Sequence, residues 1–190
     1  MAAVIGALTD RLTLELAAHP PHPPEHVNRV TAKVHADRDG WLALRWRVEG
    51  AAGLVLPPFA GQGRADGLWR TTCFELFCRK PGEVPYCELN FAPSERWAAY
   101  DFAAYREGMQ ERAMFRTPVI TPRRGRDVLL FDVALRLADL PRLPFEFGVT
   151  AVLEERSGAK SYWALDHRGE APDFHDPACF AARLAPRGRM

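Results

Sequence analysis

The stretch that decides the fold is DGWLALRWRVE, residues 39–49, in which side chains of two kinds alternate. One parity holds Leu42, Leu44, Trp46 and Val48, and the other holds Trp41, Ala43, Arg45 and Arg47. A period of two places these sets on opposite faces of a β-strand, one toward a core and one toward water. Asp39-Gly40 is a favourable hairpin turn, so we expect the preceding run, 27–35, to pair with this strand.

Similar short runs recur along the whole chain. The other predicted strands cover 12–16, 69–78, 86–91, 97–102, 118–121, 128–137, 145–153 and 161–165. Segments rich in Gly and Pro separate them, such as PPFAGQG (57–63) and RKPGEVP (79–85). This pattern predicts an all-β fold, a two-sheet antiparallel β-sandwich of jelly-roll type. Helical patterns are confined to two short segments, 105–115 and 178–183.

The chain is expected to form one domain over residues 1–190. Its 190 residues, 47% of them hydrophobic, suit one domain whose core needs neither metal nor disulfides. The sequence has no internal repeat and no long linker. We expect an N-terminal strand and a proline-rich strap at 10–26, followed by the core at 27–184. The strap contains AHPPHPPEH (18–26), which its prolines should hold extended.

Composition excludes several classes of protein. A formal net charge of +1 with scattered arginines argues against nucleic-acid binding. No apolar run approaches the ~20 residues of a membrane span. The N-terminus, MAAVIGALTDRLTLEL, has no basic region before its apolar stretch and does not resemble a secretory signal. We therefore expect a cytoplasmic protein with four reduced thiols: Cys73, Cys78, Cys87 and Cys179.

The region 68–102 has two faces of different character. The apolar face comprises Thr72, Phe74, Leu76 and Cys78 on one strand and Cys87, Leu89 and Phe91 on the next. The mixed face comprises Trp69, Cys73, Glu75 and Phe77, then Tyr86, Glu88 and Asn90. We expect seven side chains to be buried between the sheets: Phe74, Leu76, Leu89, Phe91, Phe131, Val133 and Leu135.

The mixed face has the chemistry that recognises sugars. The apolar C–H face of a pyranose stacks on an aromatic ring, and its hydroxyls need the acceptors and donors that Glu and Asn supply. The alternative is that Glu75, Glu88 and Asn90 face water on the outer side of a sheet.

A second polar region, SYWALDHRGEAPDFHDPACF (161–180), concentrates histidines and aspartates. These residue types suggest a metal site or an acid–base pair, but the spacing matches no closed metal site, and Asp-His pairs also occur in turns. The three strap histidines, His19, His22 and His26, are separated by prolines that should prevent a compact metal cluster. The chain has no phosphate-binding loop and no GxSxG element. We therefore predict no metal ligands and no catalytic residues.

Three blocks together resemble a known group of proteins: LWRTTCFELFCR (68–79), YCELNFAPSERWAAYDFAAYREGM (86–109) and YWALDHRGEAPDFHDPACF (162–180). They are similar to the DOMON-like single-domain bacterial proteins, which are related to the family-9 carbohydrate-binding modules. The resemblance extends over about residues 12–184. It implies a jelly-roll-like sandwich whose wider relatives bind sugars or haem.

The resemblance also implies a site. The spacing from Trp69 to Glu75 and the amide at Asn90 match the sugar-binding modules, whereas Glu88 stands where they tend to carry a basic residue. Near the C-terminus, Phe174-His175 stands where they tend to carry a second Trp. We therefore expect a cleft walled by Trp69 and Phe174. The predicted ligand-binding residues are Trp69, Glu75, Glu88, Asn90, Phe174 and His175.

The predicted function is non-catalytic binding of a small carbohydrate or sugar-containing metabolite. The first alternative is a haem-binding domain, with Met109 or Met114 and a histidine as axial ligands. The second is an enzyme that uses the C-terminal Asp/His block. No cofactor is predicted, since no specific motif supports haem or a structural calcium. The ligand's identity and the oligomeric state are left open.

Overall fold

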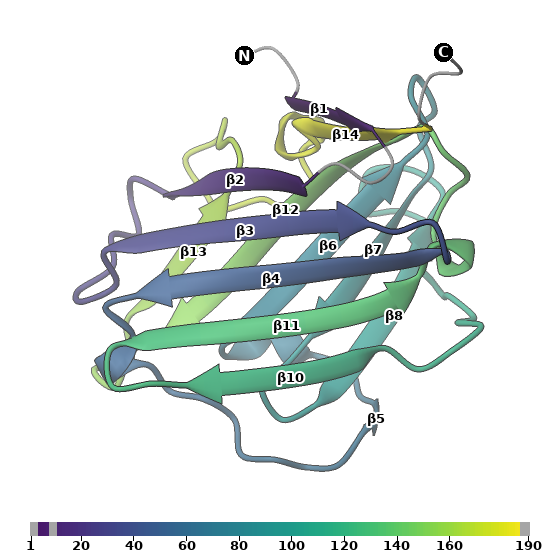
Figure 1. The fold of residues 1–190 in the computed structure, drawn as a ribbon. Coiled ribbons are helices and arrows are strands. Elements are labelled where there is room, and N and C mark those ends of the chain that lie inside the picture. The colour runs from purple at the N-terminus through teal and green to yellow at the C-terminus, as the bar shows by residue number, and fades with distance from the viewer. Residues whose placement is uncertain (1–3, 8–10, 187–190) are drawn as a thin grey trace.

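The computed structural model describes residues 4–7 and 11–186, with side chains from residue 11 onward. Both ends of the predicted domain and residue 10, where the predicted strap region begins, lie outside these ranges. Two curved sheets face each other (Figure 1). The front sheet contains β2 (Arg11–Ala18), β3 (Arg29–Ala36), β4 (Trp41–Glu49), β11 (Val128–Arg136) and β10 (Val119–Arg124). The back sheet contains β13 (Lys160–Ala164), β12 (Phe145–Glu154), β6 (Cys73–Arg79), β7 (Tyr86–Phe91), β8 (Arg96–Phe102) and β5 (Gly63–Arg64).

The two sheets are joined along one edge, where Ala17 and Ala18 of β2 pair with Ala164 and Trp163 of β13. Three short strands complete the arrangement: β1 (Val4–Ala7), β9 (Gln110–Glu111) and β14 (Ala182–Ala185). Most pairs are antiparallel, but β1·β14 and β5·β8 are parallel. The predicted all-β sandwich is confirmed, with a mixed sheet in place of a purely antiparallel one. No helix in the described part of the chain is long and apolar enough to cross a membrane.

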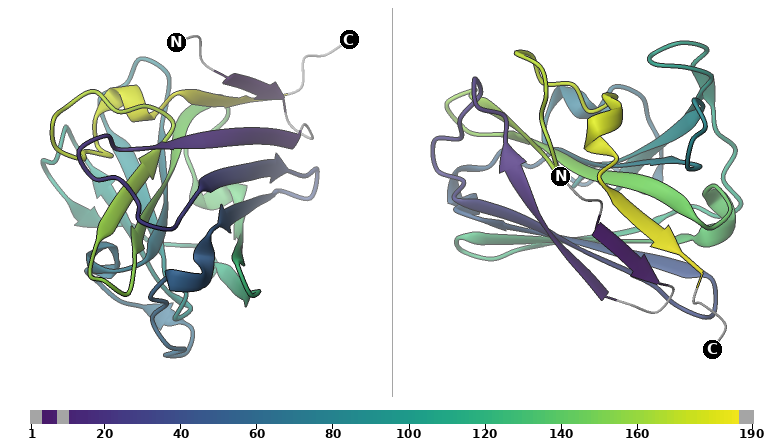
Figure 2. Two further views of the ribbon diagram at one scale, coloured as in Figure 1. Left: turned by 90° about the vertical axis from the view of Figure 1, so that its left-hand side faces the viewer. Right: turned by 90° about the horizontal axis from the view of Figure 1, so that it is seen from above.

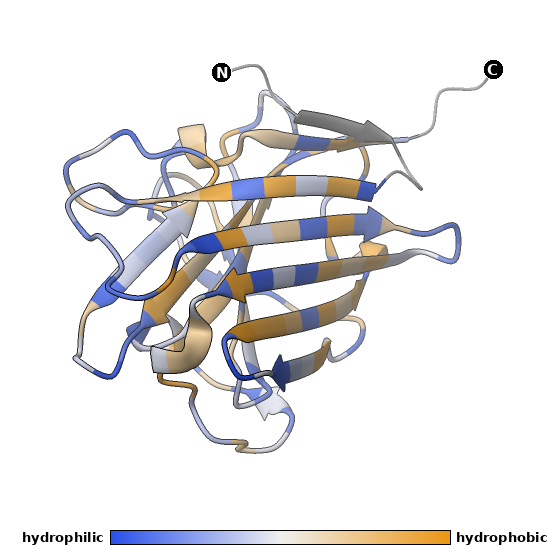
Figure 3. Cartoon of the chain, turned by 60° about the vertical axis from the view of Figure 1, so that its left-hand side comes forward, coloured by the Kyte–Doolittle hydropathy of each residue, from blue (hydrophilic) through white to orange (hydrophobic). Residues whose placement is uncertain are grey.

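The core lies between the sheets. Polar and apolar residues alternate along β3 and β4 (Figure 3), which is why one face of each strand can be buried. The seven side chains predicted for the core are all buried: Phe74, Leu76, Leu89, Phe91, Phe131, Val133 and Leu135. The rings of Phe74 and Phe131 stack with centroids 4.2 Å apart, so the two sheets meet through aromatic contact.

Both helix predictions need correction. Residues 105–109 form a turn that leads into β9, and 112–115 are irregular, because Arg106 (φ 54°) and Gly108 (φ 63°) have left-handed backbones that a helix cannot contain. Residues 178–183 contain only the end of the 3₁₀ turn η4 (Pro177–Cys179), which Asp176 caps, before β14 begins. The other 3₁₀ turns in the described residues are η1 (Ala51–Gly53), η2 (Leu68–Arg70) and η3 (Leu137–Asp139).

Two strand boundaries and the strap also differ from expectation. The strand predicted from residue 69 begins at Cys73, and Trp69 lies in η2. Strand β10 continues through Pro122 to Arg124. Proline lacks a backbone N–H, and β10 tolerates it because one side of an edge strand forms no ladder hydrogen bonds. The strap is not fully extended, because the N–H of His22 donates to the carbonyl of His19 and closes a turn.

Candidate functional site

The back sheet carries a second set of buried side chains on its outer face. Residues of this cluster include Phe77, Tyr86, Tyr100, Phe102, Val152, Phe174 and Phe180. The C-terminal segment 166–180, with η4, covers this face (Figure 2), and the loop 103–109 contributes to the same side. The alternative that this face is solvated surface is therefore wrong.

A cavity of about 460 Å³ lies between this outer face and its cover. It is lined by Trp69, Glu75, Phe77, Glu88, Tyr100, Phe102, Arg106, Met109, Val152, Tyr162, Pro172, Phe174 and His175. A volume of this size accommodates a small organic ligand. Its walls combine aromatic rings with a few polar groups, which is typical of sites for small molecules.

Two glutamates reach the cavity from adjacent strands. Glu75 on β6 is opposite Asn90, and Glu88 on β7 is opposite Phe77, so strand pairing places both carboxyl groups on one face. Their exposed fractions are 3% and 6%. The Thr150 hydroxyl donates to Oε2 of Glu75 at 3.1 Å, and the Asn90 amide donates to Oε1 of Glu88 at 2.7 Å.

Burial determines the protonation of this pair. It raises the pKa of Glu75 well above its ordinary value, and the nearby charge of Glu88 raises it further, against the bond from Thr150. Burial also raises the pKa of Glu88, and the bond from Asn90 opposes this. Two carboxyl groups so close in a low-dielectric site do not readily ionise together.

His175 is held next to Glu88 by a tyrosine. Its Nδ1 lies 2.7 Å from the hydroxyl of Tyr86, which also accepts the backbone N–H of Arg106 at 3.1 Å. If the hydroxyl donates to Nδ1, the imidazole hydrogen is on Nε2, 3.6 Å from Oε2 of Glu88. Burial, reinforced by Arg106, lowers the pKa of His175 to about 4, so the ring is neutral at neutral pH.

Arg106 is the one arginine among the described residues that line the cavity. Its Nη2 donates to Oδ1 of Asp173 at 2.7 Å, and the Tyr105 hydroxyl donates to the other oxygen of the same carboxylate. Although burial opposes it, these hydrogen bonds keep the pKa of Asp173 below its ordinary value. Arg106 and Asp173 therefore form an ion pair that links the loop 103–109 to the C-terminal segment.

The predicted aromatic walls are both present. Trp69 is 43% exposed and Phe174 is nearly buried, and both line the cavity. Asn90 does not reach the cavity lining; it is fully buried behind Glu88 and orients that carboxyl group. Met109, one of the two methionines considered for haem, lines the cavity, whereas Met114 packs against the main core.

Several lining residues were not predicted from the sequence, although the alternation of faces indicates some of them. Tyr100 is paired with Glu88 and Phe102 with Tyr86, so extending the parity argument to β8 places both rings on the mixed face. Arg106 had no such signal, because it lies in a loop that was expected to be helical.

Comparison with known proteins shows similarity at the level of the fold. No protein-family model matches the chain, and no curated protein matches it in sequence. A candidate carbohydrate-binding protein from Bacteroides uniformis superposes with a TM-score of 0.66 at 13% identity, over 96% of this chain and 100% of that one. A family-9 carbohydrate-binding module from Caldicellulosiruptor kristjanssonii, in complex with cellotriose, gives 0.56 at 12% identity, over 98% and 94%.

The chain has the fold of the family-9 carbohydrate-binding modules. A structure of a family-9 module from the same organism with glucose agrees, with a TM-score of 0.51 at 13% identity over 92% of this chain and 86% of that one. The relation to DOMON-like proteins stays a prediction.

The strap histidines are closer together than expected. Nδ1 of His22 lies 3.3 Å from Nδ1 of His19, and the ring of His167 packs edge-on against His19 with centroids 5.0 Å apart. The turn at 19–22 brings this pair of rings together, but His26 lies elsewhere, so the three strap histidines do not gather in one place.

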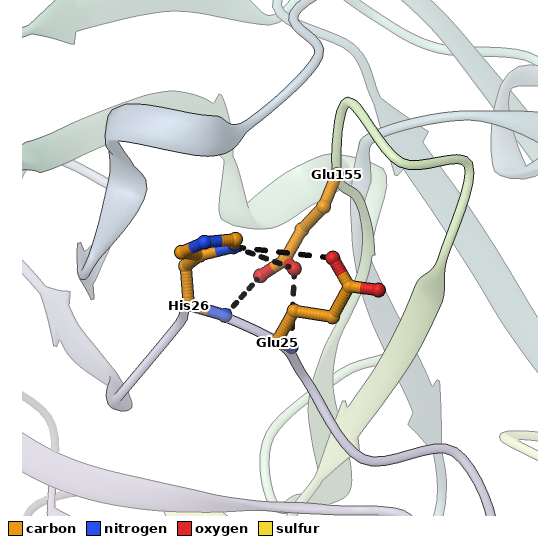
Figure 4. A group of neighbouring side chains, drawn as sticks. All are labelled: Glu25, His26 and Glu155. Carbon is orange, nitrogen blue, oxygen red and sulfur yellow. Dashed lines mark hydrogen bonds and ion pairs between the residues drawn. The ribbon is translucent and has the colours of Figure 1, made fainter.

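His26 lies in a different group, with Glu25 and Glu155 (Figure 4). One ligand atom from each lies within 4.8 Å of the others, a spacing that could accommodate a metal ion. However, the Glu155 carboxylate already accepts the backbone N–H groups of Glu25, His26 and Val27 at 2.9–3.0 Å. These bonds explain the group without a metal, since they tie the strap to the end of β12.

Proposed function

We propose that this protein binds a small carbohydrate in the cavity on the outer face of the back sheet, without chemical change to it. The observation that carries the proposal is a pair of buried carboxyl groups at a cavity that is walled by aromatic rings, one of them the partly exposed Trp69. The fold similarity to sugar-binding modules supports the same conclusion.

Each part of the site has a role in this proposal. Trp69 and Phe174 offer rings for the apolar C–H faces of a sugar, and Glu75 and Glu88 accept hydrogen bonds from its hydroxyls. His175, with its hydrogen on Nε2, can donate to a sugar oxygen. One or two stacked rings and a few hydrogen bonds give affinities in the micromolar to millimolar range, about −4 to −8 kcal/mol.

The groups around the cavity do not form a nucleophile–base pair among the described residues. His175 contacts a tyrosine hydroxyl whose pKa is raised by burial. Cys179 lies in η4, within the cover, and its thiol donates to the carbonyls of Asp166 and Asp173. Burial raises the pKa of this thiol to about 12, so it is a poor nucleophile. These contacts favour binding over catalysis.

The test is titration calorimetry of the purified protein with glucose, cellobiose and other small sugars. We expect saturable binding to at least one sugar, its loss in Trp69→Ala, and its retention in Phe115→Ala. Phe115 is a matched control because it is 75% exposed and lies outside the cavity lining. Loss of binding in both variants, or binding of no sugar, would contradict the proposal.

The haem alternative is tested in the same preparation. A Soret band in the purified protein, or a shifted band on titration with haemin that Met109→Ala and His175→Ala remove, would favour haem over sugar.

A further inference from the structure

We infer that the ligand of this cavity carries a protonated amino group, as an amino sugar does. This inference rests on the proposed carbohydrate function and names the chemical class of the ligand. It depends on the charges around the cavity, on the free oxygen atoms of the two glutamates and on the aromatic lining.

The charges in the cavity do not balance. Arg106 forms its ion pair with Asp173 at 2.7 Å; from a distance its charge opposes the burial that raises the pKa of Glu75 and Glu88, but it forms no ion pair with either. His175 is neutral at neutral pH. No lysine or arginine within the described residues forms an ion pair with Glu75 or Glu88, and the imidazole 3.6 Å from Glu88 is the neutral ring of His175. An incoming cation would therefore meet two carboxyl groups that have no cationic partner.

The free atoms of these carboxyl groups suit an ammonium group. Thr150 occupies Oε2 of Glu75 and Asn90 occupies Oε1 of Glu88. No described residue donates a hydrogen bond to Oε1 of Glu75, and Oε2 of Glu88 has only His175 Nε2 nearby, at 3.6 Å. Glu75 and Glu88 are diagonal neighbours on paired strands, a separation of ~7–8 Å between backbones. Long side chains can converge from there on one ligand atom with three N–H donors.

The lining reinforces this preference for a cation. Phe77, Tyr100, Tyr162 and Phe174 all face the cavity, and the negative faces of such rings attract a cation. A neutral sugar would leave two adjacent carboxyl groups that cannot ionise together, whereas a cation allows both to ionise. An ammonium group therefore gains contacts here that a hydroxyl at the same place does not.

The experiment compares three sugars that share the same pyranose ring and differ in the group on one carbon atom. Glucose, glucosamine and N-acetylglucosamine are titrated by calorimetry at pH 6.5, where the amine of glucosamine is charged and the acetamide is neutral. We expect glucosamine to bind the wild-type protein ~10-fold or more tightly than the other two, because a charge-assisted bond to a buried carboxylate is about twice as strong as a neutral one.

Two variants locate the preference. Glu75→Gln and Glu88→Gln keep the shape of the side chain but remove its charge, so each should bring the ratio of glucosamine to glucose affinity toward one. Glu15→Gln is the control, because Glu15 lies exposed on β2 in the front sheet. The wild-type comparison needs no variant and stays decisive if either cavity variant fails to fold.

The outcomes separate the inference from the function it rests on. Equal affinity of the wild type for glucose and glucosamine would overturn the inference and leave the sugar proposal standing. Binding of cyclohexylamine, a ring amine without hydroxyls, in the absence of any sugar binding would overturn the sugar proposal and leave a cation site. Binding of none of these probes would overturn both.

Discussion

Replacing Glu155 by glutamine exchanges one side-chain oxygen for an NH₂ group, and this small change should markedly lower the free energy of unfolding. The carboxylate is 2% exposed and accepts backbone N–H groups on both oxygens: His26 and Val27 on Oε1, and Glu25 on Oε2. In glutamine one of these oxygens becomes an NH₂ group. Whichever way the amide is placed, at least one strap N–H then faces a donor.

The expected loss follows from these bonds. A backbone donor left without an acceptor costs about 1–3 kcal/mol, and the bonds that remain change from charge-assisted to neutral. We therefore expect Glu155→Gln to lower the free energy of unfolding at pH 7 by about 2–4 kcal/mol. Glu25→Gln is the matched control, since its side chain is exposed and should change stability by less than ~0.5 kcal/mol.

The loss should also depend on pH. Burial alone would raise the pKa of Glu155, but hydrogen bonds from His26, Val27 and Glu25 outweigh it and lower this pKa below its ordinary value. A carboxyl group with a lowered pKa stabilises the fold above its unfolded-state pKa, and this stabilisation disappears as the pH falls through the folded-state pKa. The difference between wild type and Glu155→Gln should therefore shrink toward pH 3.

Urea denaturation followed by tryptophan fluorescence at pH 7, 4 and 3 measures both effects. Two results would refute the reasoning. One is a Glu155→Gln protein within ~0.5 kcal/mol of wild type at pH 7. The other is a difference that persists undiminished at pH 3.

Three further predictions follow from burial and packing. Trp69→Ala should cost about 1–2 kcal/mol in a urea melt, less than the roughly 3–5 kcal/mol of Phe74→Ala, because Trp69 is 43% exposed and Phe74 is fully buried; equal costs would place Trp69 in the core. A thiol titration of denatured, unreduced protein should find four free thiols, since all four cysteines are free and buried; fewer would indicate a disulfide. Gly148→Ala should destabilise the protein by about 1–3 kcal/mol, because the added methyl would overlap the carbonyl of Cys179 and push η4 off β12; an unchanged melt would show that η4 can move freely.

The fold was largely predictable because its signals are local. The alternation of buried and exposed side chains in 39–49 and 128–136 is a property of adjacent residues. The buried face of each of these strands is covered by the opposite sheet alone. The prediction of a helix at 105–115 was wrong because Arg106 and Gly108 have left-handed backbones. These belong to a turn, which the spacing of apolar residues does not reveal.

The candidate site was predictable only in part. Parity correctly placed Glu75 and Glu88 on one face, and the resemblance to sugar-binding modules correctly added Trp69 and Phe174 to the cavity lining. Neither could say that this face is covered, since the cover comes from residues some 90 positions later along the chain. The partnership of Arg106 with Asp173 was missed because Arg106 lies in a loop that was expected to be helical and Asp173 is 67 positions away in the cover.

By itself, the sequence determined the strands, the two faces of each strand and the chemistry that each face offers. Periodicity is sufficient for this because a side chain's direction on a strand depends only on whether its position is odd or even. The tertiary structure alone decided that the mixed face is buried, that Tyr86 holds His175 beside Glu88, and that Arg106 forms its ion pair with Asp173 and not with either glutamate. Burial and pairing depend on contacts between segments far apart in the chain, and no local pattern encodes which distant segment will supply the contact.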